Sequence, residues 1–128
     1  MGMTLRVDHE RQRIVASGEG PPTYEEICGY VDAVRPHRLA GYDELFDATE
    51  TVATLTAEQM RSLAVRAHQA PSSPVPWGLT AIVAREPAVF GLWRMYATLS
   101  EGAGVRVGVF YRLAEAEAWL LHPSGAGS

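Results

Sequence analysis

The chain has 128 residues, of which 47% are hydrophobic, and its formal net charge is −4 at pH 7. That length suits one domain with one continuous core and is too short for two ordinary domains. The acidic balance and the scattered arginines exclude the basic footprint of a nucleic-acid-binding protein. The sequence contains no lysine, which excludes Schiff-base catalysis and a P-loop.

The first twenty-two residues predict a β-hairpin. Two short extended runs, residues 5–7 and 14–16, are separated by a charged turn at residues 8–12. Two glycines and two prolines within residues 18–22 then end the second strand.

A helix and a strand follow the hairpin. Thr23 and Glu26 have the spacing of a capping box, which starts a helix from about Tyr24 to Val34. We expect residues 36–41 to form a loop because proline and glycine bound them. Residues 42–47 predict the next strand, which ends in an acidic residue.

The middle of the chain predicts a second helix between two irregular segments. Thr56 and Gln59 repeat the capping-box spacing after a long connection at residues 48–55, and they start a helix that ends at about Ala70. Residues 69–76 contain three prolines, so they form a loop.

The C-terminal part predicts two further strand–helix units. The apolar run Trp77–Val83 is typical of a strand covered on both faces, and a helix starts at Pro87. A glycine turn at residues 102–104 leads into a strand at residues 105–111 and a helix at residues 114–121.

These elements together predict the fold class. Strands that alternate with helices are typical of a parallel sheet with helices packed against it. We therefore predict an α/β fold, with a mostly parallel sheet of about five strands, an antiparallel N-terminal hairpin at its edge and about four helices. Residues 1–121 are expected to form one domain, and residues 122–128 a frayed tail.

Three segments of the C-terminal part carry a family resemblance: Phe90–Tyr96, Val107–Tyr111 and Ala118–Leu120. They resemble the closing signature of the SpoIIAA-like (STAS-type) domain family. The resemblance implies the SpoIIAA-like fold and is strongest to a bacterial branch of mostly uncharacterised single domains. That branch is related in fold to the CRAL-TRIO lipid-binding domains, which suggests a ligand as well as a protein partner.

The resemblance also singles out Thr56. Family members that antagonise anti-sigma factors begin this helix with an Asp-Ser-x-Gly motif whose serine is phosphorylated. The matching stretch here is Leu55–Glu58, in which Thr56 takes the place of the serine but the aspartate and the glycine are missing. Thr56 is therefore a candidate regulatory hydroxyl, and the alternative is a plain helix cap, since threonine is a preferred N-cap residue.

The helix that starts at Pro87 has more apolar surface than one sheet can cover. Its apolar arc is about 220° wide, whereas a surface helix needs an arc of about 100° or somewhat more. We expect a second copy of the protein, an apolar ligand or loops of the same chain to cover the remainder. The candidate ligand or dimer surface comprises Phe90, Trp93, Arg94 and Ala97, where Arg94 is either a site for an anionic head group or a solvated cation.

No catalytic or metal-binding pattern is present in the sequence. Cys28 is the only cysteine and lies in the apolar pattern of a helix, which predicts a buried thiol. The four histidines fall in separate elements, and His68 lies near a helix end where the dipole favours a cation. We interpret the acidic cluster around the third strand as solvated charges rather than an acid–base pair; its members are Asp43, Glu44, Asp47 and Glu50. We therefore predict no catalytic residue, no metal and no cofactor.

The sequence predicts a regulatory or protein-interaction module rather than an enzyme. We expect a cytoplasmic homodimer that also binds another protein, with no nucleic acid and no membrane span. The alternative is a protein that binds a small apolar or lipid-like ligand in the groove beside the Pro87–Ser100 helix.

Overall fold

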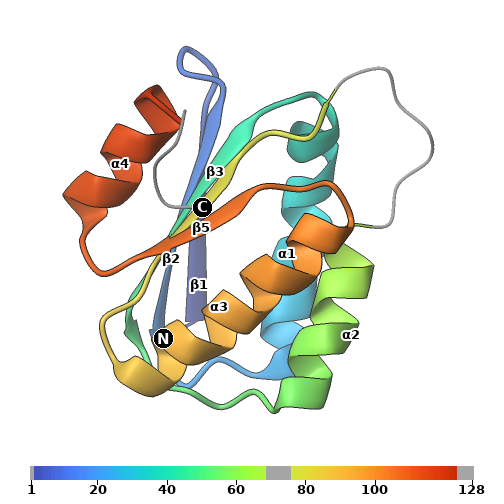
Figure 1. The fold of residues 1–128 in the computed structure, drawn as a ribbon, viewed down its shortest axis with the longest axis vertical. Helices are drawn as coiled ribbons and strands as arrows, with labels where there is room; N and C mark the ends of the chain where they lie inside the picture. The colour runs from blue at the N-terminus through green and yellow to red at the C-terminus, as the bar shows by residue number, and fades with distance from the viewer. Residues whose placement is uncertain (1, 69–75, 124–128) are drawn as a thin grey trace.

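The computed structural model describes residues 2–68 and 76–123. Over these ranges the chain forms an α/β fold with one five-stranded sheet in the order β1-β2-β3-β4-β5 (Figure 1). Strands β1 and β2 pair antiparallel, and all other neighbours pair parallel. The predicted fold class is confirmed. The elements are β1 (Gly2–Asp8), β2 (Arg13–Gly20), α1 (Tyr24–Leu39), β3 (Asp43–Thr51), α2 (Ala57–Ala67), β4 (Thr80–Val83), α3 (Pro87–Gly102), β5 (Val107–Phe110) and α4 (Leu113–Leu121).

The helices form two layers around the sheet. Helices α1, α2 and α3 cover one face, and α4 lies on the other (Figure 1). The larger core lies under the three helices and includes Ile14, Phe46 and Ile82. A smaller core under α4 joins Leu45 of β3 to Trp119 of α4. Both faces of β4 are therefore covered, which explains its nearly continuous apolar sequence.

Both predicted capping boxes are present. The Thr23 hydroxyl accepts the Glu26 N–H at 3.0 Å, and the Glu26 carboxylate accepts the Thr23 N–H at 2.8 Å. Thr56 and Gln59 make the same pair of bonds, at 3.1 and 2.9 Å. Each box satisfies two backbone donors that a helix leaves free at its start, so the sequence locates these helix starts correctly.

The first helix is longer than the sequence predicts. We expected a loop from residue 36, but α1 continues through Pro36 to Leu39. Pro36 removes one backbone hydrogen bond, and its ring is exposed, where the loss is tolerated. The turn beyond it is held by Arg38, which is 2% exposed and forms an ion pair with Glu44. This contact is tertiary, so no local pattern could reveal it.

Strand boundaries also differ from the predictions. Strand β3 extends to Thr51, four residues beyond the predicted end, because it pairs with the last residues of β2 after a register shift between Ser17 and Glu19. Strand β4 begins at Thr80 rather than at Trp77. Gly78 lies against the Tyr42 carbonyl, so close that an added Cβ would meet the oxygen at 2.0 Å. The predicted loop at residues 69–75 and the tail at residues 124–128 lie outside the described residues.

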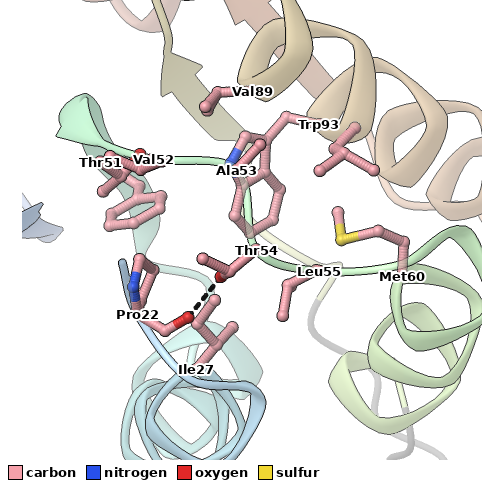
Figure 2. Close-up of a pocket in the computed structure, with 12 residues that line it drawn as sticks. Pro22, Ile27, Thr51, Val52, Ala53, Thr54, Leu55, Met60, Val89 and Trp93 are labelled. Carbon is pink, nitrogen blue, oxygen red and sulfur yellow. Dashed lines mark hydrogen bonds between the residues drawn. The ribbon is translucent and has the colours of Figure 1, made fainter. Parts of the chain in front are cut away.

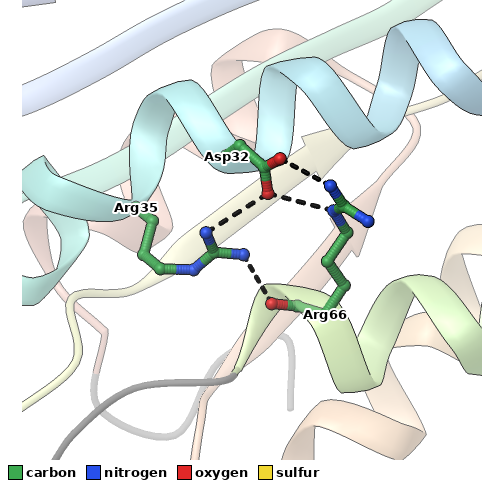
Figure 3. A network of polar contacts seen from close by, with 3 residues as sticks. All are labelled: Asp32, Arg35 and Arg66. Atoms are coloured by element: carbon green, nitrogen blue, oxygen red, sulfur yellow. Dashed lines mark hydrogen bonds and ion pairs between the residues drawn. The ribbon is translucent and has the colours of Figure 1, made fainter.

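Helices α1 and α2 are joined at the surface by a small ionic network (Figure 3). Arg66 of α2 donates two hydrogen bonds to the Asp32 carboxylate of α1, at 3.0 and 2.6 Å. Arg35 approaches the same carboxylate at 3.2 Å and donates to the Arg66 carbonyl at 2.6 Å. The two guanidinium groups hold the pKa of Asp32 below its usual value, mainly through the Arg66 hydrogen bonds.

The strand order follows the chain order, which places β1 and β5 at the two edges of the sheet. All connections between the parallel strands carry their helices to the same face. The sheet therefore lacks the crevice between oppositely directed connections in which open α/β sheets usually bind ligands. None of the helices in the described ranges is long and apolar enough to cross a bilayer.

Candidate interaction surface

The inner side of α3 is covered by the protein itself. Val89, Trp93, Tyr96 and Ser100 are buried against the sheet and α2. Trp93 is 8% exposed, and its ring meets Phe46 and Tyr96 edge-to-face at centroid distances of 5.6 and 5.3 Å. The structure therefore separates Trp93 from the other three residues of the candidate surface and places it in the core.

Phe90, Arg94 and Ala97 lie on a different side of α3, facing the free edge of β5. They line two neighbouring hollows along β5, which share Trp119 of α4. In the ribbon, β5 runs between α3 and α4 (Figure 1). We call this surface the β5 edge groove. Its lining residues are Phe90, Arg94, Ala97, Thr98 and Glu101 of α3; Arg106, Val107, Val109, Phe110 and Tyr111 of β5 and its flanks; and Glu115, Ala118, Trp119 and His122 of α4 and its end.

The two ends of the groove differ in chemistry. At the C-terminal end of β5 an open hollow of about 540 Å³ contains the rings of Phe90 and Tyr111, which stack with centroids 4.0 Å apart. At the other end a smaller hollow of about 70 Å³ contains Arg94, Glu101 and Arg106. The aromatic stack therefore lies at one end of the groove, and both of its arginines lie at the other.

The floor of the groove presents backbone groups of an edge strand. The Thr80 N–H donates to the Arg106 carbonyl at 3.1 Å, and the Ala84 N–H donates to the Phe110 carbonyl at 2.9 Å. In a parallel ladder alternate residues bond to the same neighbour. The N–H and C=O groups of Val107 and Val109 therefore point away from β4, where the described part of the chain contains no further strand.

The side chains along this edge pack mainly toward α4. Gly108 has no side chain, and an added Cβ would meet the Phe110 ring at 2.7 Å. The Phe110 ring lies back over Gly108 and packs against Trp119 at a centroid distance of 5.5 Å. Arg106 lies over Trp119 and donates to the Pro123 carbonyl at 3.0 Å. Arg94, in contrast, is exposed and makes no ion pair with any described residue.

A second polar cluster lies inside the larger core. Glu44 is 5% exposed and accepts a hydrogen bond from the Tyr30 hydroxyl and one from the Thr80 hydroxyl, the latter at 3.1 Å. Arg38 lies 3.4 Å from the same carboxylate and 5.0 Å from the Trp77 ring centre. Our interpretation of this carboxylate as a solvated charge is wrong, because Glu44 is part of a buried network.

Burial in this region also shifts the pKa values of three side chains. Desolvation raises the pKa of Tyr30 and of Tyr96 well above the usual value, with the Glu44 charge as a second cause. His68, at the end of α2, has its pKa lowered to about 4 by desolvation and by the nearby Arg38. His68 is therefore neutral at pH 7, and the expected cation at this helix end is absent. These shifted groups lie away from the β5 edge groove.

Thr56 and Cys28 occupy positions that the sequence predicts. Thr56 is exposed at the start of α2, and its oxygen accepts the Gln59 N–H. It does not line the β5 edge groove. Cys28 is buried, at 7% exposed, as expected. Among the described residues no group of three or more histidine, cysteine, aspartate or glutamate side chains could hold a metal ion.

An apolar pocket lies beside the N-terminal half of α3 (Figure 2). Leu55 and Met60 approach it from the start of α2, and Val89 and Trp93 from α3. The Thr54 hydroxyl closes one side by donating to the Pro22 carbonyl at 2.6 Å. The enclosed space is about 20 Å³, which is room for a single water molecule rather than a ligand.

Three of the four residues that the sequence singles out as a candidate surface, Phe90, Arg94 and Ala97, line the β5 edge groove, but none of the residues of β5 and its flanks is among the four. Tyr111, Arg106 and the outward backbone of Val109 belong to the surface because β5 is an edge strand. The signal that could have shown this is the chain order, since the last strand of a sheet built in sequence order lies at its edge. No protein-family model matches the chain, and no curated protein or solved structure matches it either.

Proposed function

We propose that this chain is a regulatory protein-interaction module, working in the cytoplasm, that binds its partner in the β5 edge groove. The observation that carries the proposal is the outward backbone of Val107 and Val109, which pairs with no other strand in residues 2–68 and 76–123 and has an aromatic stack at one end. An extended segment that pairs with such an edge gains main-chain hydrogen bonds, and the residues that line the groove select its side chains. The partner that binds in this way is either a second copy of the chain, as in the expected homodimer, or a different protein.

The chemistry of the groove supports binding rather than catalysis. The groups with strongly shifted pKa values, Tyr30, His68 and Tyr96, contribute to the core and not to the groove. Exposed aromatic and arginine side chains are the residue types enriched where proteins bind each other. Tyr111 and Arg94 are both exposed and supply both types on one surface.

Site-specific photo-crosslinking tests this function. A photoreactive phenylalanine analogue at position 111 is expected to form a covalent adduct with a protein, in the purified protein or in extract of the source cells. The same analogue at Val65, which is 65% exposed on α2, is the matched control and is expected to form none. No adduct from position 111 under either condition, or equal adducts from both positions, would overturn the proposal.

A second candidate function is the binding of a small apolar or lipid-like ligand beside α3. The pocket of Figure 2 favours it, because its lining is mostly apolar and includes Trp93. The enclosed space is far below the roughly 300–1,000 Å³ of ligand sites, so the connection at residues 52–56 would have to open. Native mass spectrometry of freshly purified protein tests this: an added mass of a few hundred daltons supports the ligand, and a bare chain mass excludes it.

A further inference from the structure

We propose that the occupant of the β5 edge groove is a second copy of this chain, joined by antiparallel pairing of the two β5 strands. This inference rests on the proposed function and names its partner. A two-fold axis perpendicular to the sheet, passing close to Gly108, would extend the sheet from five strands to ten across both copies. It would place α3 beside α3 on one face and α4 beside α4 on the other.

The backbone of β5 fits this pairing. In an antiparallel pair two residues exchange both of their hydrogen bonds, and both must have outward N–H and C=O groups. Val107 and Val109 have such groups, one residue to either side of Gly108. The two-fold axis therefore pairs Val107 of each copy with Val109 of the other, so that each of these outward N–H and C=O groups makes one hydrogen bond.

The length of α3 matches the length of the strand edge. Phe90 stacks on Tyr111 at one end, and Glu101 lies in the same hollow as Arg106 at the other. The helical span from 90 to 101 and the extended span from 106 to 111 are both about 17 Å. Ala97 therefore lies at nearly the level of Gly108, close to the axis, where its small side chain lets the two helices approach.

The charges on α3 are complementary to themselves under this rotation. Arg94 is three residues before Ala97, and Glu101 is four residues after it. The antiparallel helices therefore bring Arg94 of each copy close to Glu101 of the other, which gives two ion pairs. Both residues are exposed, and Arg94 makes no ion pair with any described residue of its own chain. Complementary charges of this kind fix the register of an interface.

The charges on the α4 side of the groove are also complementary to themselves under this rotation. Arg106 lies at the N-terminal end of β5, and Glu115 lines the hollow at its C-terminal end. The rotation brings the Arg106 end of one groove to the Glu115 end of the other. The opposite edge of the sheet lacks this property, because the middle of β1 presents Thr4, which bonds to Ser17 at 2.7 Å, and the exposed cation Arg6. An exposed charge in the middle of an edge strand discourages pairing.

A charge exchange tests the dimer. Sedimentation equilibrium is measured from about 1 to 200 µM for the wild type, Arg94→Glu, Glu101→Arg and the double exchange, with circular dichroism to confirm that each variant is folded. We expect a wild-type dimer, at least about tenfold weaker association for each single variant because like charges then meet, and recovery in the double exchange. Arg61→Glu on α2 is the matched control and should leave the association unchanged, because Arg61 is exposed and does not line the groove.

Three outcomes would overturn this inference: a wild type that is monomeric over the whole range, a dimer that neither single variant weakens, or a double exchange that recovers nothing. The crosslinking result separates these outcomes from the proposed function. A monomeric wild type that still crosslinks from position 111 to a different protein keeps the interaction module and excludes the second copy as its partner.

Discussion

The rings of Phe90 and Tyr111 stack almost parallel, with centroids 4.0 Å apart and planes 3° apart. Phe90 lies in the first turn of α3, and Tyr111 directly follows β5. The stack therefore fixes the start of α3 against the free edge of the sheet. It leaves Tyr111 54% exposed, so the same ring is available to a partner.

Replacement of Tyr111 with alanine should weaken association while the protein stays folded. Loss of the stack is expected to cost about 1 kcal/mol of the free energy of unfolding, since aromatic pairs contribute about 0.5–1.5 kcal/mol beyond their buried area. Urea denaturation and sedimentation equilibrium measure the two effects. Tyr111→Phe keeps the ring and is the control. If it weakens association as much as alanine does, the hydroxyl rather than the stack makes the contact.

Removal of the cation from the buried network should be the most destabilising of these changes. Arg38→Met leaves the Glu44 carboxylate buried with no cation, at an expected cost of about 3–5 kcal/mol in the free energy of unfolding. Tyr30→Phe removes one donor to the same carboxylate and should cost about 1–3 kcal/mol. Both are measured by urea denaturation.

The exposed network of Figure 3 supplies the control for Arg38→Met. Asp32→Asn breaks the pair with Arg66, whose side chains are 42% and 45% exposed, and should cost less than about 1 kcal/mol because solvent screens the charges. Equal losses for Arg38→Met and Asp32→Asn would mean that the Glu44 network is not desolvated in solution.

His68 should make the protein less stable as the pH falls. Its pKa is about 4 in the folded protein, against an ordinary value of 6.5, so only the unfolded chain takes up a proton between these values. The contribution of neutral His68 to the free energy of unfolding is therefore fully present above pH 6.5 and is lost as the pH falls toward 4. Because the ring is partly exposed, we expect a loss of about 1–2 kcal/mol after allowance for screening.

Urea denaturation at pH 7 and pH 5 checks the role of His68 against a His68→Leu variant. The variant should lose less stability between the two pH values than the wild type, since the carboxylates titrate equally in both. Identical losses would show that His68 is not the group responsible. A nuclear magnetic resonance titration of the ring then gives its pKa directly.

Thr56 should stabilise α2 through its cap. Thr56→Ala removes the acceptor of the Gln59 N–H and is expected to cost about 1 kcal/mol, whereas Thr56→Ser keeps it and should cost little. Thermal unfolding measures both. Sedimentation should show no change in association for either variant, because Thr56 does not line the groove. A change in association with unchanged stability would instead indicate that the hydroxyl contacts a partner.

The sequence predicts well those features that depend on neighbours along the chain. The capping boxes at Thr23 and Thr56 locate two helix starts, because each needs only residues three positions apart. The alternation of strands and helices gives the fold class, because it depends only on the order of the elements along the chain. Helix and strand ends are different: the last turn of α1 depends on Arg38 meeting Glu44, and the end of β3 depends on its pairing with β2.

The candidate surface also combines a local feature that the sequence predicts with a tertiary feature that it does not. The helical pattern indicates a wide apolar arc on α3, but it does not say what covers each part of that arc. Helix α2 and the sheet cover Trp93, whereas Phe90 meets Tyr111 at the edge of the sheet. Only the order of the strands in space makes this distinction, and periodicity carries no information about that order.

The most direct test of the account is amide hydrogen exchange at Val109, measured in concentrated and in dilute protein. The Ile82 amide, in a strand with neighbours on both sides, is the internal reference and should stay protected in both. If two β5 strands pair, the Val109 amide is protected in the concentrated sample and exchanges fast on dilution or in the Arg94→Glu variant. Fast exchange at Val109 at every concentration would contradict this pairing.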